Sequence, residues 1–600
     1  MRILLAVLVI GGVCRASGGD LPATLPLVPY PQKVVALEGR VRDLEMVCRA
    51  DPSLAHEGYR LRVADGKAEI RHSTEAGRFY ALQTLAQLRS ADGSYPAVEI
   101  EDAPAFPWRG VLLDESRHFW GKEVVKRLLD RMAAFKLNVF HWHLTDAQGW
   151  RLQIDRYPEL TDRGARRPIP DWEWHIRDAK DAVGEYGPFF YTKDEVREVL
   201  DYAKARHIRV IPEIEIPGHS RELILCHPDF SCLDWGTFAD RIRDKRFTNK
   251  ADVLCVGNDA VMTFFENVLT EVAELFPDEI IHIGGDECPR DNWKECPRCR
   301  KRMEEEKIAD ENGLQAWVTH RFAKFLAGKG KRIIGWDEIL SGGLPAGAVV
   351  MSWRGSEGGI AAASQGHDAV ICPHSFCYLD YPTGELDDAC EYPRFCQTAF
   401  TPLERIYSLD PYEGIPQEQR KHVLGSQTMN WCESTWTEKD LEYKMWPRTC
   451  ANAEIVWTGP GRRTFADFRR RLEPIARRLA AGGVNVSLAP FAGRGVYERL
   501  TPAPKRIVYC PARISPAALE KVFVTTGKVR GVPKDFADTC FLLDLAPTGV
   551  MITASGEWGT RSAKETLGQM RKLASGCSDL LAARIYDWPD DLGTGTPDAR

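Results

Sequence analysis

The residues best suited to chemistry in this sequence are acids, histidines and tryptophans that follow short apolar runs. The first three runs end in Asp114-Glu-Ser-Arg117-His118, His141-Trp-His143-Leu-Thr-Asp146 and Glu213-Ile-Glu215-Ile-Pro-Gly-His219. Later runs end in Asp286-Glu287, Trp336-Asp337-Glu338, Trp353-Arg354, Tyr378-Leu-Asp380 and Trp431-Cys-Glu433. Indole faces stack on the apolar faces of sugar rings, and carboxylates accept hydrogen bonds from sugar hydroxyls. These residue types therefore favour carbohydrate binding coupled to acid–base chemistry.

Eight apolar runs of strand length alternate with helical segments and must position these groups. They cover 110–114, 138–144, 209–216, 280–286, 332–336, 348–353, 368–372 and 423–431. Such a pattern predicts a (β/α)8 barrel, an α/β fold, because parallel strands covered by helices are buried on both faces. The active site of this barrel forms at the carboxyl ends of its strands, where the acids and tryptophans stand.

A small α+β domain is expected before the barrel and a second copy after it. Residues 59–63 and 68–71 alternate as strands, and Phe79, Leu82, Leu85 and Leu88 follow at helical spacing. Residues 541–570 align with 59–88 at a constant offset of 482, with ten of thirty positions identical. We expect the N-terminal domain over 18–106, the barrel over 107–485 and a C-terminal module over 486–600, with a structural or carbohydrate-docking role for the last.

The composition is that of a globular protein. The 600 residues are 44% apolar and 27% charged, with a net charge of −6. Without a global basic excess, neither nucleic acid nor an anionic membrane surface is an expected partner. Apolar residues 3–13, followed by small residues, predict a signal peptide over 1–17 and export to the periplasm or the extracellular space. That run is too short for a stable membrane span, which needs to cross about 30 Å.

Sixteen of the 17 cysteines lie outside the predicted signal peptide. In an exported chain some of them are expected to pair, and the nearest neighbours are Cys226/Cys232, Cys372/Cys377 and Cys390/Cys396. Cys296-Pro-Arg-Cys299 with Cys288 also suggests a metal knuckle. Three cysteines without an evident fourth ligand favour a disulfide plus one spare thiol instead.

Four sequence blocks resemble the signatures of family-20 glycoside hydrolases, the β-N-acetylhexosaminidases. They are 109–118, 137–146, 212–219 and 282–287, and the match runs from about 29 to 479. The resemblance implies removal of terminal non-reducing N-acetylglucosamine or N-acetylgalactosamine from oligosaccharides or glycoconjugates. It implies retention of configuration, with no cofactor and no catalytic metal.

The adjacent acids Asp286 and Glu287 cannot both take the usual roles of acid and nucleophile. Neighbours on an extended strand point to opposite sides, whereas a retaining pair flanks one bond at about 5 Å. The resemblance implies that the substrate's own 2-acetamido oxygen attacks the anomeric carbon and forms an oxazolinium ion. Glu287 would then be the general acid and base, and Asp286 would hold the acetamido N–H.

The resemblance also implies roles for nine further residues. Tyr378 resembles the donor to the acetamido carbonyl, and three indoles resemble the walls and floor of the sugar pocket: Trp336, Trp353 and Trp431. The residues that resemble the hydroxyl-binding set are Arg117, Asp380 and Glu433. The pair that resembles the residues positioning and tuning Glu287 is Asp146 and His219. Ala147 and Cys432 depart from the family's pattern beside this site.

Two other interpretations remain open. His141 and His143 share one face of a strand and could bind a catalytic metal with Asp146 and His282. A non-catalytic glycan-binding protein on the same barrel is the other alternative. Intact Asp286, Glu287 and Tyr378 argue against it, because binding alone needs no proton donor.

Overall fold

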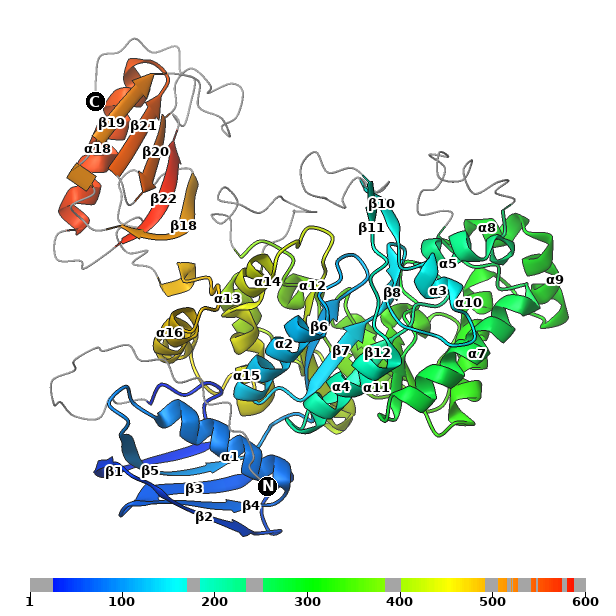
Figure 1. Cartoon of the computed structure of the whole chain (residues 1–600), viewed down its shortest axis with the longest axis horizontal. Helices are drawn as coiled ribbons and strands as arrows, with labels where there is room; N and C mark the ends of the chain where they lie inside the picture. Colours follow the sequence, from blue (N-terminus) through cyan, green and yellow to red (C-terminus); the bar gives the residue numbers. More distant parts are fainter. Residues whose placement is uncertain are drawn as a thin grey trace. The chain divides into compact units, whose positions relative to one another are not determined.

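A computed structural model describes residues 25–169, 184–233, 252–383, 401–491, 506–514, 519–520, 522–526, 541–546, 549–574 and 580–587. The predicted signal peptide and the pair Cys390/Cys396 lie outside these residues. The chain divides into two compact units (Figure 1). The first comprises Met1–Asp380 and Glu404–Val484, and the second Tyr381–Leu403 and Asn485–Arg600.

The first unit contains a closed barrel of eight parallel strands, in the order β12-β13-β14-β15-β16-β17-β6-β7. This confirms the predicted fold. The strands are β6 (Trp108–Asp114), β7 (Val139–His143), β12 (Arg209–Glu213), β13 (Ile280–His282), β14 (Arg332–Trp336), β15 (Val349–Ser352), β16 (Ala369–Ile371) and β17 (Val423–Asn430).

Helices surround the barrel. They are α2 (Lys122–Ala134), α4 (Lys193–Lys204), α7 (Asp259–Leu275), α10 (Glu311–Ala327), α11 (Glu357–Ser364), α14 (Glu438–Met445), α15 (Arg448–Thr458) and α16 (Phe465–Ala481). A capping box begins α4: Glu195 N–H donates to Thr192 Oγ1, and the Thr192 amide donates to Glu195 Oε2.

Short elements lie in the connections between strands and helices. The helices are α3 (Glu159–Asp162), α5 (Arg221–Cys226), η1 (Pro228–Phe230), α8 (Asp291–Glu295), α9 (Pro297–Glu305), η3 (Asp337–Leu340), α12 (His374–Cys377), α13 (Leu403–Tyr407), η4 (Gln417–His422) and η5 (Ala489–Phe491). Two small hairpins pair β8 (Thr145–Asp146) with β9 (Gly149–Trp150) and β10 (Arg167–Ile169) with β11 (Gly184–Tyr186).

The N-terminal α+β module precedes the barrel within the first unit. Its five-stranded sheet has the order β1-β5-β3-β4-β2 and carries α1 (Glu75–Leu88). The strands are β1 (Lys33–Val41), β2 (Glu45–Ala50), β3 (Tyr59–Ala64), β4 (Lys67–His72) and β5 (Tyr95–Asp102). Trp457 of α15 completes the buried cluster of this module, so module and barrel helix share a core.

The second unit contains a module of the same topology. Its sheet order is β18-β22-β20-β21-β19, with one helix, α18 (Gly556–Ala574). The strands are β18 (Arg506–Ile514), β19 (Val522–Thr526), β20 (Phe541–Ala546), β21 (Gly549–Ala554) and β22 (Leu580–Asp587). Strands β20 and β21 stand at the predicted offset from β3 and β4, and Leu543 and Ile552 are buried like Leu61 and Ile70. The internal repeat is confirmed.

No helix within the described part of the chain is long and apolar enough to cross a bilayer.

Candidate active site

A tight glycine turn places Asp286 and Glu287. Strand β13 ends at His282, and Gly284 (φ 62°), Gly285 (φ 100°) and Glu287 (φ 42°) all adopt left-handed backbone conformations. A Cβ on Gly284 would lie 1.7 Å from Glu215 Oε2, so only glycine fits there. The premise that Asp286 and Glu287 sit on an extended strand is therefore wrong, because the turn brings both acids toward one side chain.

That side chain is His219, which follows β12 and has a φ of 48°. Its Nδ1 lies 3.2 Å from Asp146 Oδ1, and its Nε2 lies 3.3 Å from Asp286 Oδ2 and 3.8 Å from Glu287 Oε2. Burial acts to lower the pKa of His219, but the carboxylates of Asp146 and Asp286 raise it well above 6.5. His219 thus joins the three acids, and their carboxylates favour the protonated form of its imidazole.

Aromatic rings from four barrel strand ends stand next to one another. Trp353 and Tyr378 are stacked with centroids 6.1 Å apart and planes at 14°. Trp431 lies 5.9 Å from Tyr378 and 5.9 Å from Trp336. Trp336 is almost fully buried and donates from Nε1 to Glu213 Oε1 at 2.7 Å. The predicted indole and phenol groups therefore lie side by side, and the hydrogen bond to Glu213 fixes the Trp336 ring.

The predicted hydroxyl-binding residues meet around Arg117. Its guanidinium lies 2.9 Å from Asp146 Oδ2, 3.7 Å from Glu433 Oε1 and 5.4 Å from the Trp431 ring centre. Burial and the neighbouring Glu433 carboxylate raise the pKa of Asp380 to about 7. Glu433 thus lies between the two other residues: it approaches Arg117, and its charge acts on Asp380.

Several buried polar atoms of the candidate site have no hydrogen-bond partner among the described residues. They include Asp286 Oδ1, Asp380 Oδ1 and Trp431 Nε1. Each such group loses the hydrogen bonds it would make in water. Two acceptors and one donor are therefore available to a polar ligand.

A network that the sequence did not assign lies beneath the aromatic rings. Glu213 is approached by His141 Nε2 at 3.0 Å and His282 Nδ1 at 2.9 Å. Burial alone would raise the pKa of Glu213. The charges of His282, His143 and His141 outweigh burial and hold this pKa well below its usual range. This carboxylate supports Trp336 and the neighbouring strands.

The metal set considered from sequence does not form as one group. His141 clusters with Glu213 and His282, whereas His143 clusters with Glu213 and Glu215. Asp146 belongs to neither cluster and lies against His219 and Arg117 instead. The interpretation of His141 and His143 as a joint metal pair is therefore wrong.

Two buried acids that the sequence left without a role have pKa values raised above the usual range of a carboxyl group. Burial and the charges of Asp286 and Glu213 raise the pKa of Glu215 well above 4.5. Burial and the charges of Asp286 and Asp337 raise the pKa of Glu338 to about 8. Their position at strand ends was visible in the sequence, but their protonation depends on burial, which spacing does not show.

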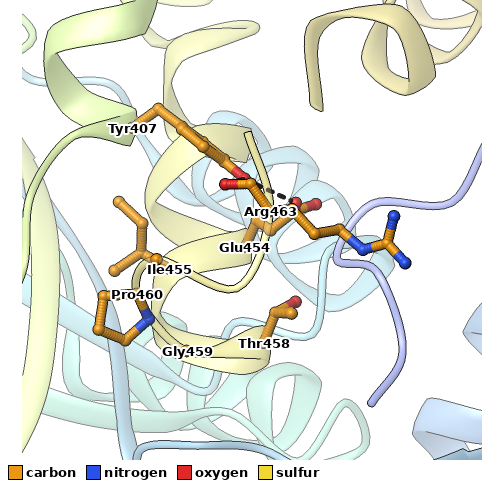
Figure 2. A pocket seen from close by; sticks show the side chains of 8 residues that line it. Tyr407, Glu454, Ile455, Thr458, Gly459, Pro460 and Arg463 are labelled. Atoms are coloured by element: carbon orange, nitrogen blue, oxygen red, sulfur yellow. Dashed lines mark hydrogen bonds between the residues drawn. The ribbon is translucent and has the colours of Figure 1, made fainter. Parts of the chain in front are cut away.

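Two of the small hollows in the described part of the chain each have about 230 Å³ of space, including open solvent. One borders Asp146, Glu215 and His219. The other, in Figure 2, is lined by α15 and residues 459–463, where Tyr407 Oη donates to Glu454 Oε1 at 3.2 Å. Only the first adjoins the predicted catalytic groups, since the second surrounds a structural hydrogen bond.

Two of the cysteine pairs predicted from sequence spacing lie within the described residues, Cys226/Cys232 and Cys372/Cys377, and neither forms a disulfide. Cys226, Cys232, Cys372 and Cys377 are all free thiols. Cys226 lies on α5 with its Sγ 3.6 Å from the Glu159 carbonyl, while Cys232 lies against Cys299. The grouping of Cys288 with Cys296 and Cys299 is also wrong, because the latter two gather with Cys232 and Cys255.

The site defines a carbohydrate-active barrel, because acids, a bridging histidine and an indole stacked on a phenol meet at the carboxyl end of a (β/α)8 barrel. Family models agree with this class: "Glycosyl hydrolase family 20, catalytic domain" matches residues 106–460, and "Glycosyl hydrolase family 20, domain 2" matches 28–103. The chain belongs to glycosyl hydrolase family 20, a family of enzymes.

Relatives and a solved structure agree with the family. A beta-hexosaminidase of Porphyromonas gingivalis is 38% identical over 82% of this chain and 62% of its own length. One of Vibrio furnissii is 38% identical over 68% of this chain and 66% of its own. The chain thus spans slightly less than two thirds of these two relatives.

A crystal structure of an exo β-N-acetylglucosaminidase from Vibrio harveyi, in complex with N-acetylglucosamine, superimposes with a TM-score of 0.70. It is 31% identical to this chain, and the match covers 78% of this chain and 80% of that one.

Proposed function

We propose that this protein is a retaining exo-β-N-acetylhexosaminidase that releases terminal N-acetylglucosamine or N-acetylgalactosamine from oligosaccharides and glycoconjugates. The observation that carries the proposal is the set of unpartnered buried atoms beside the stacked rings of Trp353 and Tyr378. Asp286 Oδ1 accepts the acetamido N–H, and Asp380 Oδ1 accepts a sugar hydroxyl. The relatives named above support the same substrate class.

The reaction needs the acetamido oxygen to be aimed at the anomeric carbon. His219 occupies Asp286 Oδ2, which leaves Oδ1 for the amide N–H of the substrate. That hydrogen bond orients the amide and increases the electron density on its oxygen. The oxygen attacks the anomeric carbon while the glycosidic bond breaks, and the oxazolinium ion carries the positive charge that the Asp286 carboxylate stabilises.

Glu287 moves the proton in both steps. It gives its proton to the leaving glycosidic oxygen, and in the second step it takes one from the water that attacks the anomeric carbon. The new carbon–oxygen bond opens the oxazolinium ring and restores the acetamido group. Two inversions at one carbon give net retention, and no electrons are transferred to the protein.

The experiment that tests the proposal compares an aryl N-acetyl-β-glucosaminide with the unacetylated aryl β-glucosaminide. The acetylated substrate should react faster by a factor on the order of 10³ or more, because its nucleophile is intramolecular. A thiazoline mimic of the oxazolinium ion should inhibit competitively. Equal rates on both glycosides, or a sugar trapped covalently on a side chain, would contradict the mechanism.

We also propose that the chain is exported after removal of residues 1–17. Expression of the full chain should yield a processed protein outside the cytoplasm, with its N-terminus near Gly18 by mass spectrometry. An unprocessed cytoplasmic protein would contradict this localisation.

A further inference from the structure

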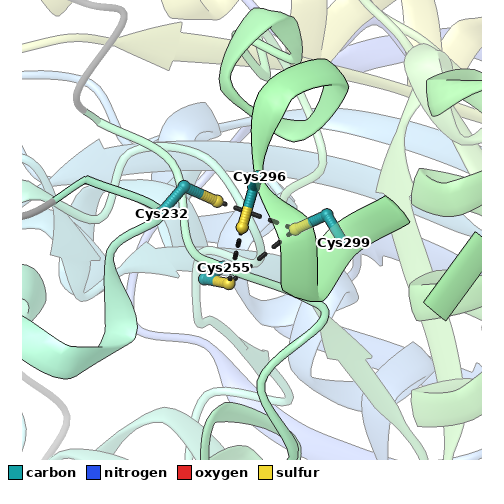
Figure 3. Close-up of side chains that lie close together, drawn as sticks. All are labelled: Cys232, Cys255, Cys296 and Cys299. Carbon is teal, nitrogen blue, oxygen red and sulfur yellow. Dashed lines mark hydrogen bonds between the residues drawn. The ribbon is translucent and has the colours of Figure 1, made fainter. Parts of the chain in front are cut away.

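Four cysteines from three separate stretches of the chain converge on one point beside the barrel (Figure 3). Sγ of Cys232 lies 3.6 Å from that of Cys299, and Sγ of Cys255 lies 3.6 Å from Cys296 and 3.7 Å from Cys299. All four sulfur atoms lie within 4.8 Å of one another. Three of the four residues are buried, and Cys232 is partly buried.

These separations are those of a tetrahedral metal site. With Zn–S bonds of about 2.3 Å, a tetrahedron of sulfurs has edges of about 3.8 Å. The three distances above match this edge, whereas a disulfide would bring two sulfurs to about 2.05 Å. The four thiols therefore surround a space that one ion of this size fills.

The backbone around the cluster is shaped to hold the sulfurs. Asn258 N–H donates to the Cys255 carbonyl at 2.9 Å and closes a turn that contains Gly257. A Cβ on Gly257 would lie 2.3 Å from the Arg298 carbonyl carbon and 2.4 Å from the Cys299 nitrogen. The turn can approach the start of α9 only because residue 257 is glycine, and the Gly257 N–H points to Cys299 Sγ.

A positive charge stands beside the cluster: the Arg298 guanidinium interacts with the sulfurs of Cys255 and Cys296. Arg298 itself is fixed by donation to the Ser231 carbonyl at 2.7 Å. A tetrathiolate zinc centre carries a net charge of −2, which this guanidinium partly offsets.

We propose that Cys232, Cys255, Cys296 and Cys299 bind one Zn²⁺ as a structural tetrathiolate site. Binding replaces the four thiol protons by four Zn–S bonds, and the protons go to solvent with no change in oxidation state. All four positions around the ion are protein sulfurs, so none is left for a water or a substrate.

The ion would join the two connections that carry the catalytic candidates. Residues 253–254 pair with the chain just before His219: Leu254 N–H donates to the Pro217 carbonyl at 3.0 Å, and Val253 bridges to Gly218. Cys296 and Cys299 follow Glu287 through α8, where Trp293 Nε1 donates to the Leu254 carbonyl at 2.9 Å. The zinc site therefore holds the segments of His219 and Asp286 together.

Metal analysis of the purified full chain, prepared without added zinc, tests the site. We expect about one zinc per chain by elemental analysis and native mass spectrometry. The variants Cys296→Ser and Cys299→Ser should lose most of it. Cys226→Ser is the matched control, because it removes a buried thiol from the same connection outside the cluster, and it should keep the full zinc content.

Measurements on the unmodified chain keep the proposal testable if the serine variants fail to fold. A mercurial reagent should form mercury–sulfur bonds with the four cysteines, release the zinc as it does so and lower the melting temperature. Cobalt added to the zinc-free chain should give the intense sulfur-to-metal absorption of a tetrahedral thiolate site. Iron in place of zinc, or four cysteines recovered as two disulfides in a metal-free native chain, would overturn the proposal. None of these readouts depends on the glycosidase mechanism.

Discussion

Asp286 and Glu287 are adjacent and contact the same histidine, yet their surroundings differ. The Asp286 side chain is 14% exposed and the Glu287 side chain is 62% exposed. A largely buried carboxylate with a fixed partner, such as Asp286, is suited to hold one particular group of the substrate in place. An exposed one can reach a leaving group of variable size, so the division of roles inferred from sequence has a physical basis in the turn at Gly284.

Glu287→Gln should lower kcat by about 10²–10⁴ for substrates with poor leaving groups, because it removes the proton donor. Activated aryl glycosides, whose leaving groups need no proton, should be affected much less in the first step. Steady-state kinetics on a leaving-group series measure this. A uniform loss across the series would assign Glu287 another role.

Asp286→Asn should act differently, since orientation of the acetamido group is needed whatever leaves. We expect a reduction of about 10²–10³ in kcat/KM for good and poor leaving groups alike. The same kinetic series measures it. A dependence on the leaving group like that of Glu287→Gln would contradict the separation of roles.

Glu338 should make stability depend on pH. Its pKa is raised to about 8 by burial and by Asp286 and Asp337, against a usual value of 4.5. The folded state therefore holds this proton longer than the unfolded state, and stability falls as pH rises from about 4.5 to 8. Glu338→Gln removes that dependence, so the variant should gain roughly 1–3 kcal/mol relative to the wild type across this interval.

Thermal unfolding of both proteins between pH 5 and pH 8 measures this difference. The surface variant Glu357→Gln, at the exposed start of α11, is the control and should track the wild type at every pH. If the Glu338→Gln difference were constant with pH, the carboxyl would not be protonated in the folded state.

At the scale of the elements, periodicity in the sequence was sufficient for the barrel and for the repeated module. Apolar runs buried on both faces identify β14 without error, and strand β20 lies at the predicted offset from β3. Strand ends were harder. The sequence predicts one strand over residues 280–286, but Gly284 and Gly285 leave the extended conformation after His282. A pattern of hydrophobic residues cannot predict this change, because it says nothing about the φ of a glycine.

The spacing of residues in the sequence could not predict contacts between distant segments. Cys296 and Cys299 form a recognisable pair, but their partners Cys232 and Cys255 lie far back along the chain and apart from each other. Only the folded connections after β12 and β13 bring them together. The Glu213 network has the same origin, since its histidines come from β7 and β13.

Gly284→Ala tests the turn that places the two acids. An added Cβ would overlap Glu215 Oε2 at 1.7 Å, and alanine is also strained at a φ of 62°. We expect a loss of stability of about 1–3 kcal/mol, with kcat reduced by about tenfold or more. Gly366→Ala is the control for the backbone term alone, because φ is 79° there and nothing lies within 4 Å.

Chemical unfolding and steady-state kinetics on the two variants distinguish strain from displacement of the acids. Gly366→Ala should lose some stability and keep full activity. If Gly284→Ala behaved in the same way, the close approach of Glu215 would not be what sets the positions of Asp286 and Glu287.

At the scale of the whole first unit, a buried polar network fastens the N-terminal module to the barrel. Lys136, which follows α2, places Nζ 2.9 Å from Asp102 Oδ2 and 2.9 Å from Tyr59 Oη. Trp457 Nε1 donates to Asp102 Oδ1 at 3.0 Å, and Lys136 Nζ lies 4.4 Å from the centre of that indole ring. Side chains of module and barrel therefore complete each other's hydrogen bonds in a buried site.

Replacing only one of the two charged residues, Asp102 or Lys136, should lower the free energy of unfolding more than replacing both. Asp102→Asn leaves the Lys136 ammonium buried without its counter-charge, so we expect a loss of about 3–5 kcal/mol in the free energy of unfolding. Lys136→Met should cost a similar amount by stranding the Asp102 carboxylate. The double variant should recover part of that loss, because no unpaired charge remains at the junction.

Urea unfolding of the two single variants and the double variant gives the coupling energy directly. The exposed pair Glu75–Arg78 on α1 supplies the control: Arg78→Ala should change stability by less than about 1 kcal/mol. Strict additivity of the two junction substitutions would mean that Lys136 and Asp102 act independently. If the double variant lost less stability than the sum of the two single losses, charge pairing between Lys136 and Asp102 would hold the small module to the barrel. That pairing would explain why module and catalytic barrel form one folded unit.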